Sequence, residues 1–416
     1  MPVYFPGANG PLFQILGLVH PWLRTARLPH ELINKSGKTI RLKVGKAIPF
    51  EKLQSFDRAA DMTAYLRLRT YILKAACDNE KRVVHPSRTP VESGVTPRGG
   101  QRYASQLVRE VGELPREQLL VQSGEYLVYY ARAPQIPCLL HEIGRLRELT
   151  FRRVHEGTGK PIDLDRFDAH YLHLFIWNDR KNEVVGAYRI GQTDYILRYF
   201  GQYGLYTSTL FTYKRSLLDQ ISPALELGRS FVRPEYQRSY SSLLLLWKGI
   251  SAFVVRNPRY KNLFGPVSIN NEYHTISQQL MAASLKLNND LPDLGKLVKA
   301  KRPFPIKPIK GCDLNINNLI QDINELSELI ADIETENKGI PILLRQYLKL
   351  GGKILGFNRD HHFGNVLDGL ILVDLTMTRP DLLERYMGRP GAETFLNYHN
   401  QDMPSASGDD FMRNQA

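Results

Sequence analysis

The sequence predicts an α/β or α+β domain with a mixed sheet, and three observations support this class. Short segments that are apolar, or that alternate apolar and polar residues as strands do, recur between residues 125 and 269. Segments with helical apolar spacing lie between them, in an order that fits one sheet covered by helices. With 416 residues, 43% of them hydrophobic and 23% charged, the chain is globular and long enough for two or three domains.

The predicted elements divide the chain into five parts. Residues 1–77 form a basic piece with a strand at 39–44 and a helix at 62–76, and the Pro- and Gly-rich residues 78–102 form an exposed linker. The main domain, 103–300, contains strands at 125–131, 171–177, 184–190, 225–232 and 262–269 and helices at 136–152, 242–256 and 275–287.

The C-terminal part consists of an extension over 301–396 that packs on the main domain and a flexible tail over 397–416. A basic, proline-containing arm at 295–310 leads into the extension. The extension itself is expected to hold an acidic amphipathic helix at 314–336 and a strand at 368–374.

The charge balance predicts an acidic partner. The chain has 55 Lys and Arg against 42 Asp and Glu, a net charge of +13, so nucleic acid, an anionic membrane and an acidic carrier protein are all candidates. Because no helix-turn-helix, zinc-finger or RNP signature is present, we expect no nucleic-acid partner. Residues 20–46 hold seven Lys and Arg and one acid, which fits either a solvated face or a site for lipid headgroups or phosphate.

The cysteines and the apolar segments indicate in which compartment of the cell the protein is expected. Three widely spaced cysteines without metal-ligand spacing predict a reducing compartment and no metal site. No apolar stretch is long enough to span a membrane, and the N-terminus lacks the features of a signal peptide. The sequence therefore predicts a cytoplasmic protein that is soluble or peripheral.

The densest chemical signal is the segment 225–244. A strand runs into a Pro-containing turn, a polar loop and a strongly apolar helix. The free N–H groups at the start of such a helix bind phosphate well. An acyl carrier brings a phosphate of this kind on its pantetheine arm.

This segment, Val232-x-Pro-Glu-Tyr-Gln-Arg-Ser-Tyr-Ser-Ser, resembles the fourth strand and phosphate loop of the GNAT superfamily of N-acetyltransferases. The resemblance implies a mixed, mostly antiparallel sheet flanked by helices. The usual loop has two glycines where this chain has Tyr240 and Ser242, and their side chains crowd the approach of a pyrophosphate. By the resemblance, the residues that contact the phosphopantetheine are Gln237, Arg238, Ser239, Tyr240, Ser241 and Ser242.

Four further blocks widen the resemblance. Glu226-Leu-Gly-Arg229, Asp165-Arg-Phe-Asp168, Leu146-Arg-Glu-Leu-Thr-Phe151 and Gly186-Ala-Tyr-Arg189 resemble the pattern of acyl-homoserine-lactone synthases, which take acyl groups from acyl carrier protein. Residues 114–279 are still more similar to the ornithine-lipid N-acyltransferases, a group often labelled hemolysin-like. The segments 340–352 and 366–370 resemble the C-terminal part of its longer members.

Residues 1–77 resemble the end of a lysophosphatidate-type O-acyltransferase. The catalytic motif of that family is His-x-x-x-x-Asp, and none of the eleven histidines of this chain has Asp at that spacing. We therefore interpret residues 1–77 as a truncated remnant and assign it no O-acyl transfer.

The resemblance assigns roles to the remaining candidates. Glu226 is the base that deprotonates an amine, with an ion pair to Arg229 as the alternative reading. The backbone N–H groups of Phe231 and Val232 stabilise the oxyanion, and Tyr273 is either a general acid for the departing thiolate or a packing residue. The acceptor is bound by Arg147, Asp165, Asp168, Arg189 and Arg229, although the two aspartates also fit a surface turn.

The implied reaction moves a fatty or 3-hydroxy-fatty acyl group from acyl carrier protein, with acyl-CoA as an alternative donor, to the α-amine of an amino acid. No bound cofactor is expected. Ornithine is the best-known acceptor of the family, and glycine, lysine and glutamine are alternatives. The product is a lyso-aminolipid, so we expect the protein on the inner face of the cytoplasmic membrane. The competing hypothesis is a non-catalytic, hemolysin-like membrane- or lipid-binding protein.

Overall fold

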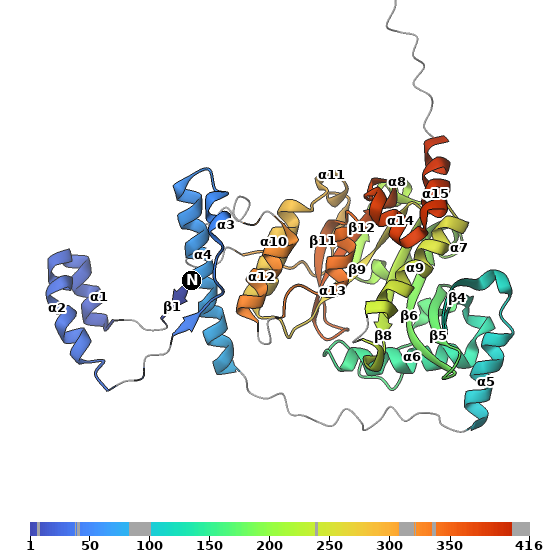
Figure 1. The fold of residues 1–416 in the computed structure, drawn as a ribbon, viewed down its shortest axis with the longest axis horizontal. Coiled ribbons are helices and arrows are strands. Elements are labelled where there is room, and N and C mark those ends of the chain that lie inside the picture. Colours follow the sequence, from blue (N-terminus) through green and yellow to red (C-terminus); the bar gives the residue numbers. More distant parts are fainter. Residues whose placement is uncertain are drawn as a thin grey trace, which may run out of the picture. The chain divides into compact units, whose positions relative to one another are not determined.

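The computed structural model describes residues 1–5, 9–37, 39, 42–82, 101–237, 240–307, 320, 322–334 and 338–401 of the chain (Figure 1). These residues belong to two compact units. The first comprises 1–87, 274–284 and 306–340, and the second comprises 88–273, 285–305 and 341–416. The segment 301–396, expected as one extension, is thus divided between both units, while the nature of residues 1–77 remains a prediction. No helix of the described residues is long and apolar enough to cross a membrane.

The first unit is mainly helical. Its helices are α1 (Pro11–Val19), α2 (Pro21–Ile33), α3 (Phe50–Gln54), α4 (Ala59–Arg82), α12 (Ile323–Ile333) and the first part of α10 (Thr275–Asn288). A short antiparallel pair joins β1 (Val3–Tyr4) to β2 (Lys43–Val44), so the strand predicted at 39–44 is only two residues long where it is described. A buried ion pair between Arg69 and Asp332, with Nη2 2.8 Å from Oδ2, fixes α4 against α12.

The second unit is built on an eight-stranded sheet with the order β11-β12-β9-β8-β6-β5-β4-β3. The strands are β3 (Leu119–Ser123), β4 (Tyr126–Arg132), β5 (Leu172–Asn178), β6 (Glu183–Gln192), β8 (Ala224–Val232), β9 (Asn262–Ile269), β11 (Lys353–Asp360) and β12 (Val366–Asp374). Every neighbouring pair is antiparallel except β8 and β9, which are parallel. The predicted fold class, a mixed and mostly antiparallel sheet flanked by helices, is confirmed.

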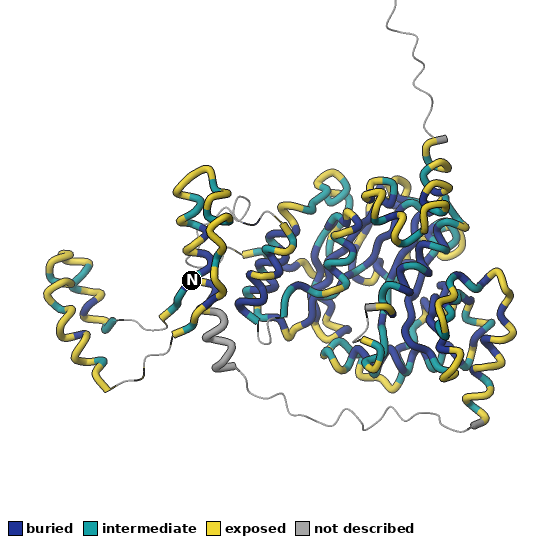
Figure 2. The backbone as a smooth tube through the Cα atoms, viewed as in Figure 1, coloured by how far each residue is buried: buried dark blue, intermediate teal, exposed yellow. Residues whose placement is uncertain are grey.

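Helices cover both faces of the sheet, which is why its strands are buried along most of their length (Figure 2). On one face, α6 (Pro137–Arg152) inserts Leu139, Ile143 and Leu146 into a core that includes Phe175 and Trp177 of β5. The other helices of the unit are α5 (Gln101–Gly112), α7 (Thr193–Phe200), α8 (Arg215–Ile221), α9 (Tyr240–Arg256), α11 (Pro292–Gly295), α13 (Ile342–Lys349), α14 (Pro380–Met387) and α15 (Arg389–Gln401).

On the opposite face, α9 crosses the sheet at close range. An added Cβ on Gly249 would lie 2.6 Å from Val128 of β4. Trp247 packs edge-on against Tyr188 of β6 and Tyr347 of α13, with ring centroids 6.4 and 5.1 Å apart. The apolar residues of the predicted helix 242–256 therefore serve mainly to pack α9 against its neighbouring elements.

Three predicted segments take a different form. The part of the basic arm up to residue 305 belongs to the second unit, where β10 (Val298–Ala300) pairs with β7 (Phe211–Tyr213). Residues 397–401, expected in the flexible tail, form the end of α15. The acidic helix expected at 314–336 spans 323–333 as α12, and residues 83–100, 308–319 and 402–416 lie outside the described residues.

Candidate active site

The parallel strands β8 and β9 separate partway along their length. They pair only over 224–226 and 262–264, although β8 continues to Val232 and β9 to Ile269. Gly265 lies at the point of divergence, where an added Cβ would come within 2.1 Å of the carbonyl oxygen of Leu227. The later part of β8 thus has a free edge on the β9 side.

One of the two predicted oxyanion donors is directed to this free edge. Arg233 donates its N–H to the carbonyl of Val185 on β6. Since successive N–H groups of a strand point to opposite edges, the N–H of Val232 points away from β6 and that of Phe231 points toward it, in register with Ala187. The geometry therefore favours Val232 over Phe231 as an oxyanion donor.

The loop after β8 holds the predicted carrier-binding residues. Gln237 donates from Nε2 to the carbonyl of Val232 at 2.7 Å, and the buried Ser242 lies in the first turn of α9 with Oγ 3.4 Å from the carbonyl of Tyr236. Ser241 is exposed. Arg238, Ser239 and the side chain of Tyr240 lie outside the described residues, so the phosphopantetheine role of this loop stays a prediction.

Glu226 is fully buried and tightly held. Its Oε1 accepts the N–H of Thr207 at 2.6 Å, and its Oε2 accepts the N–H of Tyr206 at 3.1 Å and the hydroxyl of Tyr171. Burial raises the pKa of Glu226 above its ordinary value, in spite of these hydrogen bonds. The alternative ion pair with Arg229 is not formed. A β-bulge near Gly228, with Arg229 at φ +50°, directs that guanidinium to other carboxylates.

Those carboxylates belong to a buried network of three arginines and three aspartates on the α6 face. Arg147 Nη1 lies 3.1 Å from Asp168 Oδ1, Arg189 Nη1 lies 2.6 Å from Asp165 Oδ1, and Arg229 Nε lies 3.1 Å from Asp163 Oδ2. Arg189 also approaches Asp168 at 3.3 Å. Equal numbers of opposite charges make burial tolerable, and the surface-turn reading of the aspartates is wrong for Asp168.

The residues of this network differ in their exposure, and therefore in how easily a substrate can reach them. Arg147 and Asp168 neutralise each other, with side chains 0% and 4% exposed, whereas the side chains of Arg229 and Asp165 are 10% and 26% exposed. Burial alone would raise the pKa of Asp168, but the guanidinium groups of Arg147 and Arg189 hold it well below its usual range. Burial lowers the pKa of the adjacent His173 to about 4. Among the predicted acceptor-binding residues, Arg229 and Asp165 are therefore the accessible ones.

A second buried carboxylate, Asp368 of β12, faces the same side of the sheet. It lies opposite Ser268 of β9, whose Oγ is 2.8 Å from Asp368 Oδ1. Asp368 is 3% exposed, and within the described part of the chain its Oδ2 receives no hydrogen bond. Burial, together with the carboxylates of Asp360 and Glu156, raises the pKa of Asp368 to about 8 although the Ser268 hydroxyl opposes the shift.

Arg229 connects Asp368 to the ion network. Its Nη1 donates to the hydroxyl of Tyr206 at 3.2 Å, and its guanidinium stacks 4.6 Å from the ring centroid of Phe363. The positive charge of Arg229 lowers the pKa of Asp368, and the negative charge of Asp368 raises that of Tyr206. Arg229 of β8 thus lies close enough to Asp368 of β12 to affect its pKa, and a cation with a carboxylate of high pKa fits the two ends of an amino acid.

Comparisons with known proteins agree with this geometry. Residues 146–248 match the family described as acetyltransferase (GNAT) domain. Two glycine N(alpha)-acyltransferases, from Phocaeicola vulgatus and Bacteroides thetaiotaomicron, are 29% identical over 298 and 290 residues, which cover 68% and 66% of this chain and 88% and 82% of theirs. These matches support a GNAT-type N-acyltransferase, with the family domain over 146–248 and the two curated relatives over about two thirds of the chain.

Two further comparisons cover less of the molecule. An L-ornithine N(alpha)-acyltransferase from Brucella abortus is 33% identical over 126 residues, 27% of this chain and 43% of the relative. The solved AHL synthase LasI is 18% identical, with a TM-score of 0.26 over 39% of this chain and 79% of that one. The second likeness is too weak to carry an argument.

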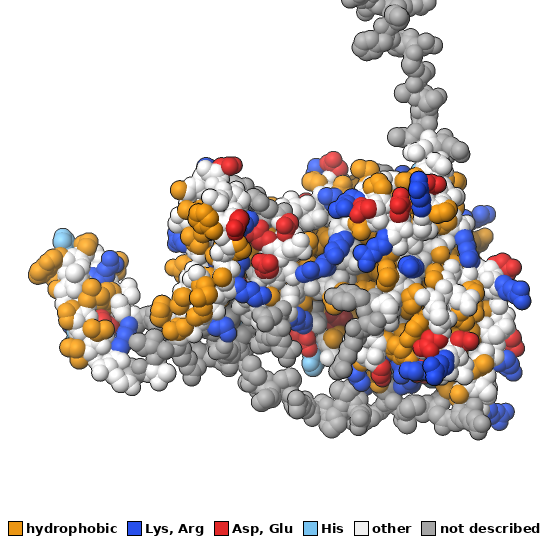
Figure 3. Space-filling model, viewed as in Figure 1, with side chains coloured by type: hydrophobic (Ala, Val, Ile, Leu, Met, Phe, Trp, Pro, Cys, Tyr) orange, Lys and Arg blue, Asp and Glu red, His pale blue; other side chains and the backbone are white. Residues whose placement is uncertain are grey.

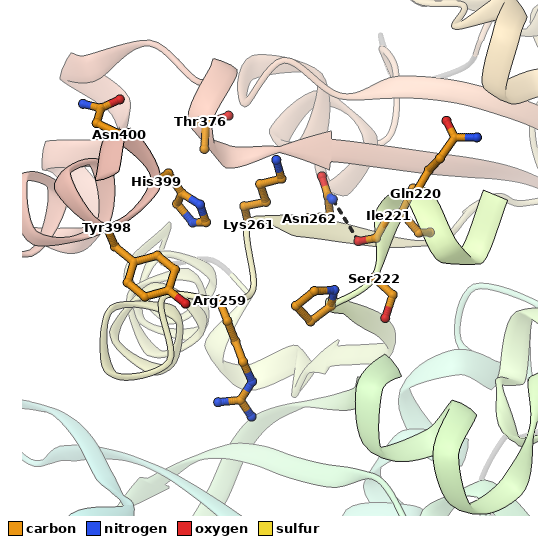
Figure 4. Close-up of a pocket in the computed structure, with 11 residues that line it drawn as sticks. Gln220, Ile221, Ser222, Arg259, Lys261, Asn262, Thr376, Tyr398, His399 and Asn400 are labelled. Carbon is orange, nitrogen blue, oxygen red and sulfur yellow. Dashed lines mark hydrogen bonds between the residues drawn. The ribbon is translucent and has the colours of Figure 1, made fainter. Parts of the chain in front are cut away.

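A cavity of about 500 Å³ opens at the other end of β8, away from the predicted site residues (Figure 4). It lies beside Pro223 before β8 and Asn262 at the start of β9, and Arg259, Lys261 and His399 line it as well. At this end β8 and β9 are paired, so no free edge is available for a thioester. We therefore take the diverging end as the candidate active site.

The structure adds residues that the sequence interpretation missed and leaves one predicted residue undecided. Asp163, Tyr171, Tyr206 and Asp368 all contact residues of the candidate site, yet none was predicted from the sequence. The available signal for Asp368 was a charged residue inside an apolar strand, since such residues are seldom buried without a role. Tyr273 is buried in the turn before α10, and its acid role stays a prediction.

Proposed function

We propose that this protein transfers a fatty or 3-hydroxy-fatty acyl group from acyl carrier protein to the α-amine of an amino acid, in aminolipid biosynthesis. The observation that carries the proposal is the site at the diverging end of β8. There the N–H of Val232 faces the free edge and Arg229 lies near the buried Asp368. An acyl transfer to an amine needs an oxyanion donor, a proton acceptor and a site for the acceptor's carboxylate.

The acceptor we propose to test first is glycine. The two glycine N(alpha)-acyltransferases match over most of their own length, whereas the ornithine enzyme matches over less than half. Arg229 would bind the acceptor carboxylate, because a guanidinium pairs well with that group. Ornithine, the acceptor implied by the sequence resemblance, is the second candidate and places a further ammonium near Asp165.

The proton of the amine needs a carboxylate that is both reachable and basic. Both oxygens of Glu226 already accept hydrogen bonds from three donors, while Asp368 retains one oxygen without a donor in the described structure. The amine attacks the thioester carbon, Asp368 takes the amine proton, Val232 stabilises the oxyanion, and the carbon–sulfur bond then breaks as the thiolate is protonated. A carboxylate with a pKa close to the working pH is well matched to this task.

The proposed donor is acyl carrier protein, because basic side chains flank the loop that follows β8. The Nζ of the exposed Lys181 lies 5.2 Å from the ring centroid of Tyr236 in that loop. The exposed Arg153 helps to keep the pKa of Glu235 below its ordinary value, against the effect of burial. An acidic carrier would approach its phosphopantetheine site past these groups. We propose no bound cofactor and no nucleic-acid partner.

The function is tested by incubating the purified protein with acyl carrier protein thioesters and either glycine or ornithine, and by identifying N-acyl products by mass spectrometry. We expect acylglycine or acylornithine and free carrier thiol in equal amounts. Hydrolysis of the thioester without an amide product would contradict the proposal.

The donor is tested with charge reversal at the loop. We expect Arg153→Glu with Lys181→Glu to raise KM for the acyl carrier protein about tenfold and to leave KM for acyl-CoA nearly unchanged, since each lost attraction is worth about 1 kcal/mol or less at a surface. Arg389→Glu on α15, whose side chain is 78% exposed, is the matched control. Equal effects on both donors would argue against a carrier-docking role.

A further inference from the structure

The helical hairpin of α1 and α2 carries an unusual amount of exposed apolar surface. On α1, Phe13 is the one buried residue, while Leu18 and Val19 are 88% and 70% exposed. On α2, Trp22 and Leu32 are 68% and 77% exposed. Figure 3 shows hydrophobic side chains along the visible surface of this hairpin. Soluble proteins rarely expose contiguous apolar patches of this kind without a partner.

Several exposed apolar residues of α2 share one side of the helix. Trp22, Pro29 and Ile33 are spaced by seven and four residues, and Leu32 borders the same face. Arg24, Arg27 and Glu31 lie on the opposite side, and Glu31 is buried where its Oε2 accepts the N–H of Gly10 at 2.9 Å. α2 is therefore amphipathic, with its apolar face outward.

The neighbouring α1 has no charged residue in its sequence Pro-Leu-Phe-Gln-Ile-Leu-Gly-Leu-Val. At nine residues it is far too short to span a bilayer, which takes about 20. A short apolar helix beside an amphipathic one is the arrangement of a segment that lies in a membrane interface. The exposed Trp22 fits this setting, because indole rings favour the boundary between headgroups and acyl chains.

Charge identifies the kind of membrane. Residues 20–46 hold seven Lys and Arg against one acid, and the one acid, Glu31, is buried within the hairpin. Arg24 and Lys46 are exposed. Basic residues next to an apolar face add attraction to anionic lipids. The hairpin and the basic residues that follow it in the chain thus offer the two interactions that hold a peripheral protein on an anionic bilayer.

We propose that α1 and α2 dock this protein on an anionic lipid bilayer, with Leu18, Trp22 and Leu32 inserted among the lipids. The inference rests on the proposed function in one respect, which is that a lyso-aminolipid product belongs in a membrane. It names the segment of the chain that makes the contact.

The probe is the full-length protein with vesicles of phosphatidylglycerol and phosphatidylethanolamine, compared with vesicles of phosphatidylcholine. We expect sedimentation with the anionic vesicles, weakening as salt is added. The chain has three tryptophans, and Trp177 and Trp247 are buried. A blue shift of the emission on binding therefore reports on Trp22, and the shift should disappear in Trp22→Phe while sedimentation remains.

The matched variants separate insertion from folding. Leu18→Ser, Trp22→Ser and Leu32→Ser together should weaken vesicle binding at least tenfold and leave the unfolding midpoint unchanged, since the three side chains are exposed. Tyr199→Ser, Ile342→Ser and Met377→Ser, at side chains 61, 61 and 80% exposed on the second unit, should not change binding. Arg24→Gln with Lys46→Gln should reduce the preference for anionic vesicles about fivefold per residue.

The outcomes also separate this inference from the proposed function. Absence of vesicle binding by the wild type, or self-association through the hairpin in place of lipid binding, overturns the docking proposal. Equal binding by the serine variant overturns it too. Acyl transfer to a soluble amino acid is assayed on the same proteins in detergent. Vesicle binding without transfer would refute the enzyme function alone, and transfer without vesicle binding would refute the docking alone.

Discussion

The α6 face of the second unit and the N-terminal hairpin distribute polar and apolar groups in opposite ways. On the α6 face, Arg147, Arg189 and Asp168 are almost completely buried, whereas on the hairpin Leu18 and Leu32 are mostly exposed. Buried charges persist when each finds an opposite charge or a hydrogen bond. The charges of the first region are thus paired with one another, while for the apolar side chains of the second we propose a partner in a lipid bilayer. Asp368 lies between these cases, because it is a buried carboxylate whose side chain accepts one hydrogen bond within the described residues, from Ser268.

The largest expected effect follows from changing Asp368. We expect Asp368→Asn to lower kcat/KM by about 10² to 10⁴, the usual contribution of a general base. Because the pKa of Asp368 is raised to about 8, the wild-type rate should climb with pH and level off above that value. The asparagine variant should lose this dependence. A pH–rate profile of both proteins measures it, and a wild-type profile that is flat from pH 6 to 9 would refute the role.

Stability gives an independent check on the same variant. The folded pKa of about 8 lies above the unfolded value of about 3.9, so the wild type loses stability as pH rises from about 4 to about 8. Asp368→Asn removes this loss. It should therefore be more stable than the wild type at pH 8.5, by on the order of a few kcal/mol, while being less active. A variant that is both inactive and unstable at pH 8.5 would point to a structural role.

The next largest effect is expected at Arg189, a buried arginine that pairs with two carboxylates. Arg189 pairs with Asp165 and Asp168 at 2.6 and 3.3 Å, so Arg189→Met leaves two carboxylates with too few cations. We expect a loss of about 3–5 kcal/mol in the free energy of unfolding. Urea unfolding at pH 7 measures it, with Arg389→Met of the exposed pair to Glu393 as the control, which should lose less than about 1 kcal/mol.

A smaller effect is expected at Glu226. The glutamine of Glu226→Gln presents an NH₂ group to the N–H of Tyr206 or Thr207, which now donate to the carboxylate. Leaving one buried donor unsatisfied costs about 1–3 kcal/mol, and the folded fraction should keep its activity within about tenfold. Unfolding midpoints and rates per folded molecule are measured for the wild type and the variant. Together they distinguish a structural role of Glu226 from a catalytic one. A loss above a hundredfold at full stability would restore Glu226 as the base.

The regular part of the fold follows from local sequence. The strands at 172–178 and 224–232 and the helix at 137–152 lie within a few residues of their predicted positions, because their apolar runs are long and bounded by turn residues. The motifs Glu226-Leu-Gly-Arg229 and Asp165-Arg-Phe-Asp168 also fall where the network forms. Periodicity and motif spacing are local properties, and they were enough for these elements.

The partners of the site residues depend on contacts between distant segments. Asp368 meets Ser268 across 100 residues of sequence, and Glu226 meets Tyr171 across 55. The positive φ of Arg229 moves its guanidinium from Glu226 to Asp163, which no alternation rule predicts. The sequence also did not predict that the apolar side chains of the hairpin are exposed. The basic run at 20–46 alone did not distinguish a solvated face from a lipid site.

The smallest expected effect distinguishes the two regions most directly. Leu18→Ser with Leu32→Ser should change the free energy of unfolding by less than about 0.5 kcal/mol, because exposed side chains contribute little to folding. Leu246→Ala, at a residue of α9 with no exposed surface, should lose about 2–5 kcal/mol. Denaturation in the absence of lipid measures both. A large loss in the hairpin variant would show that its leucines are covered by protein in solution, and the two regions would then be organised alike.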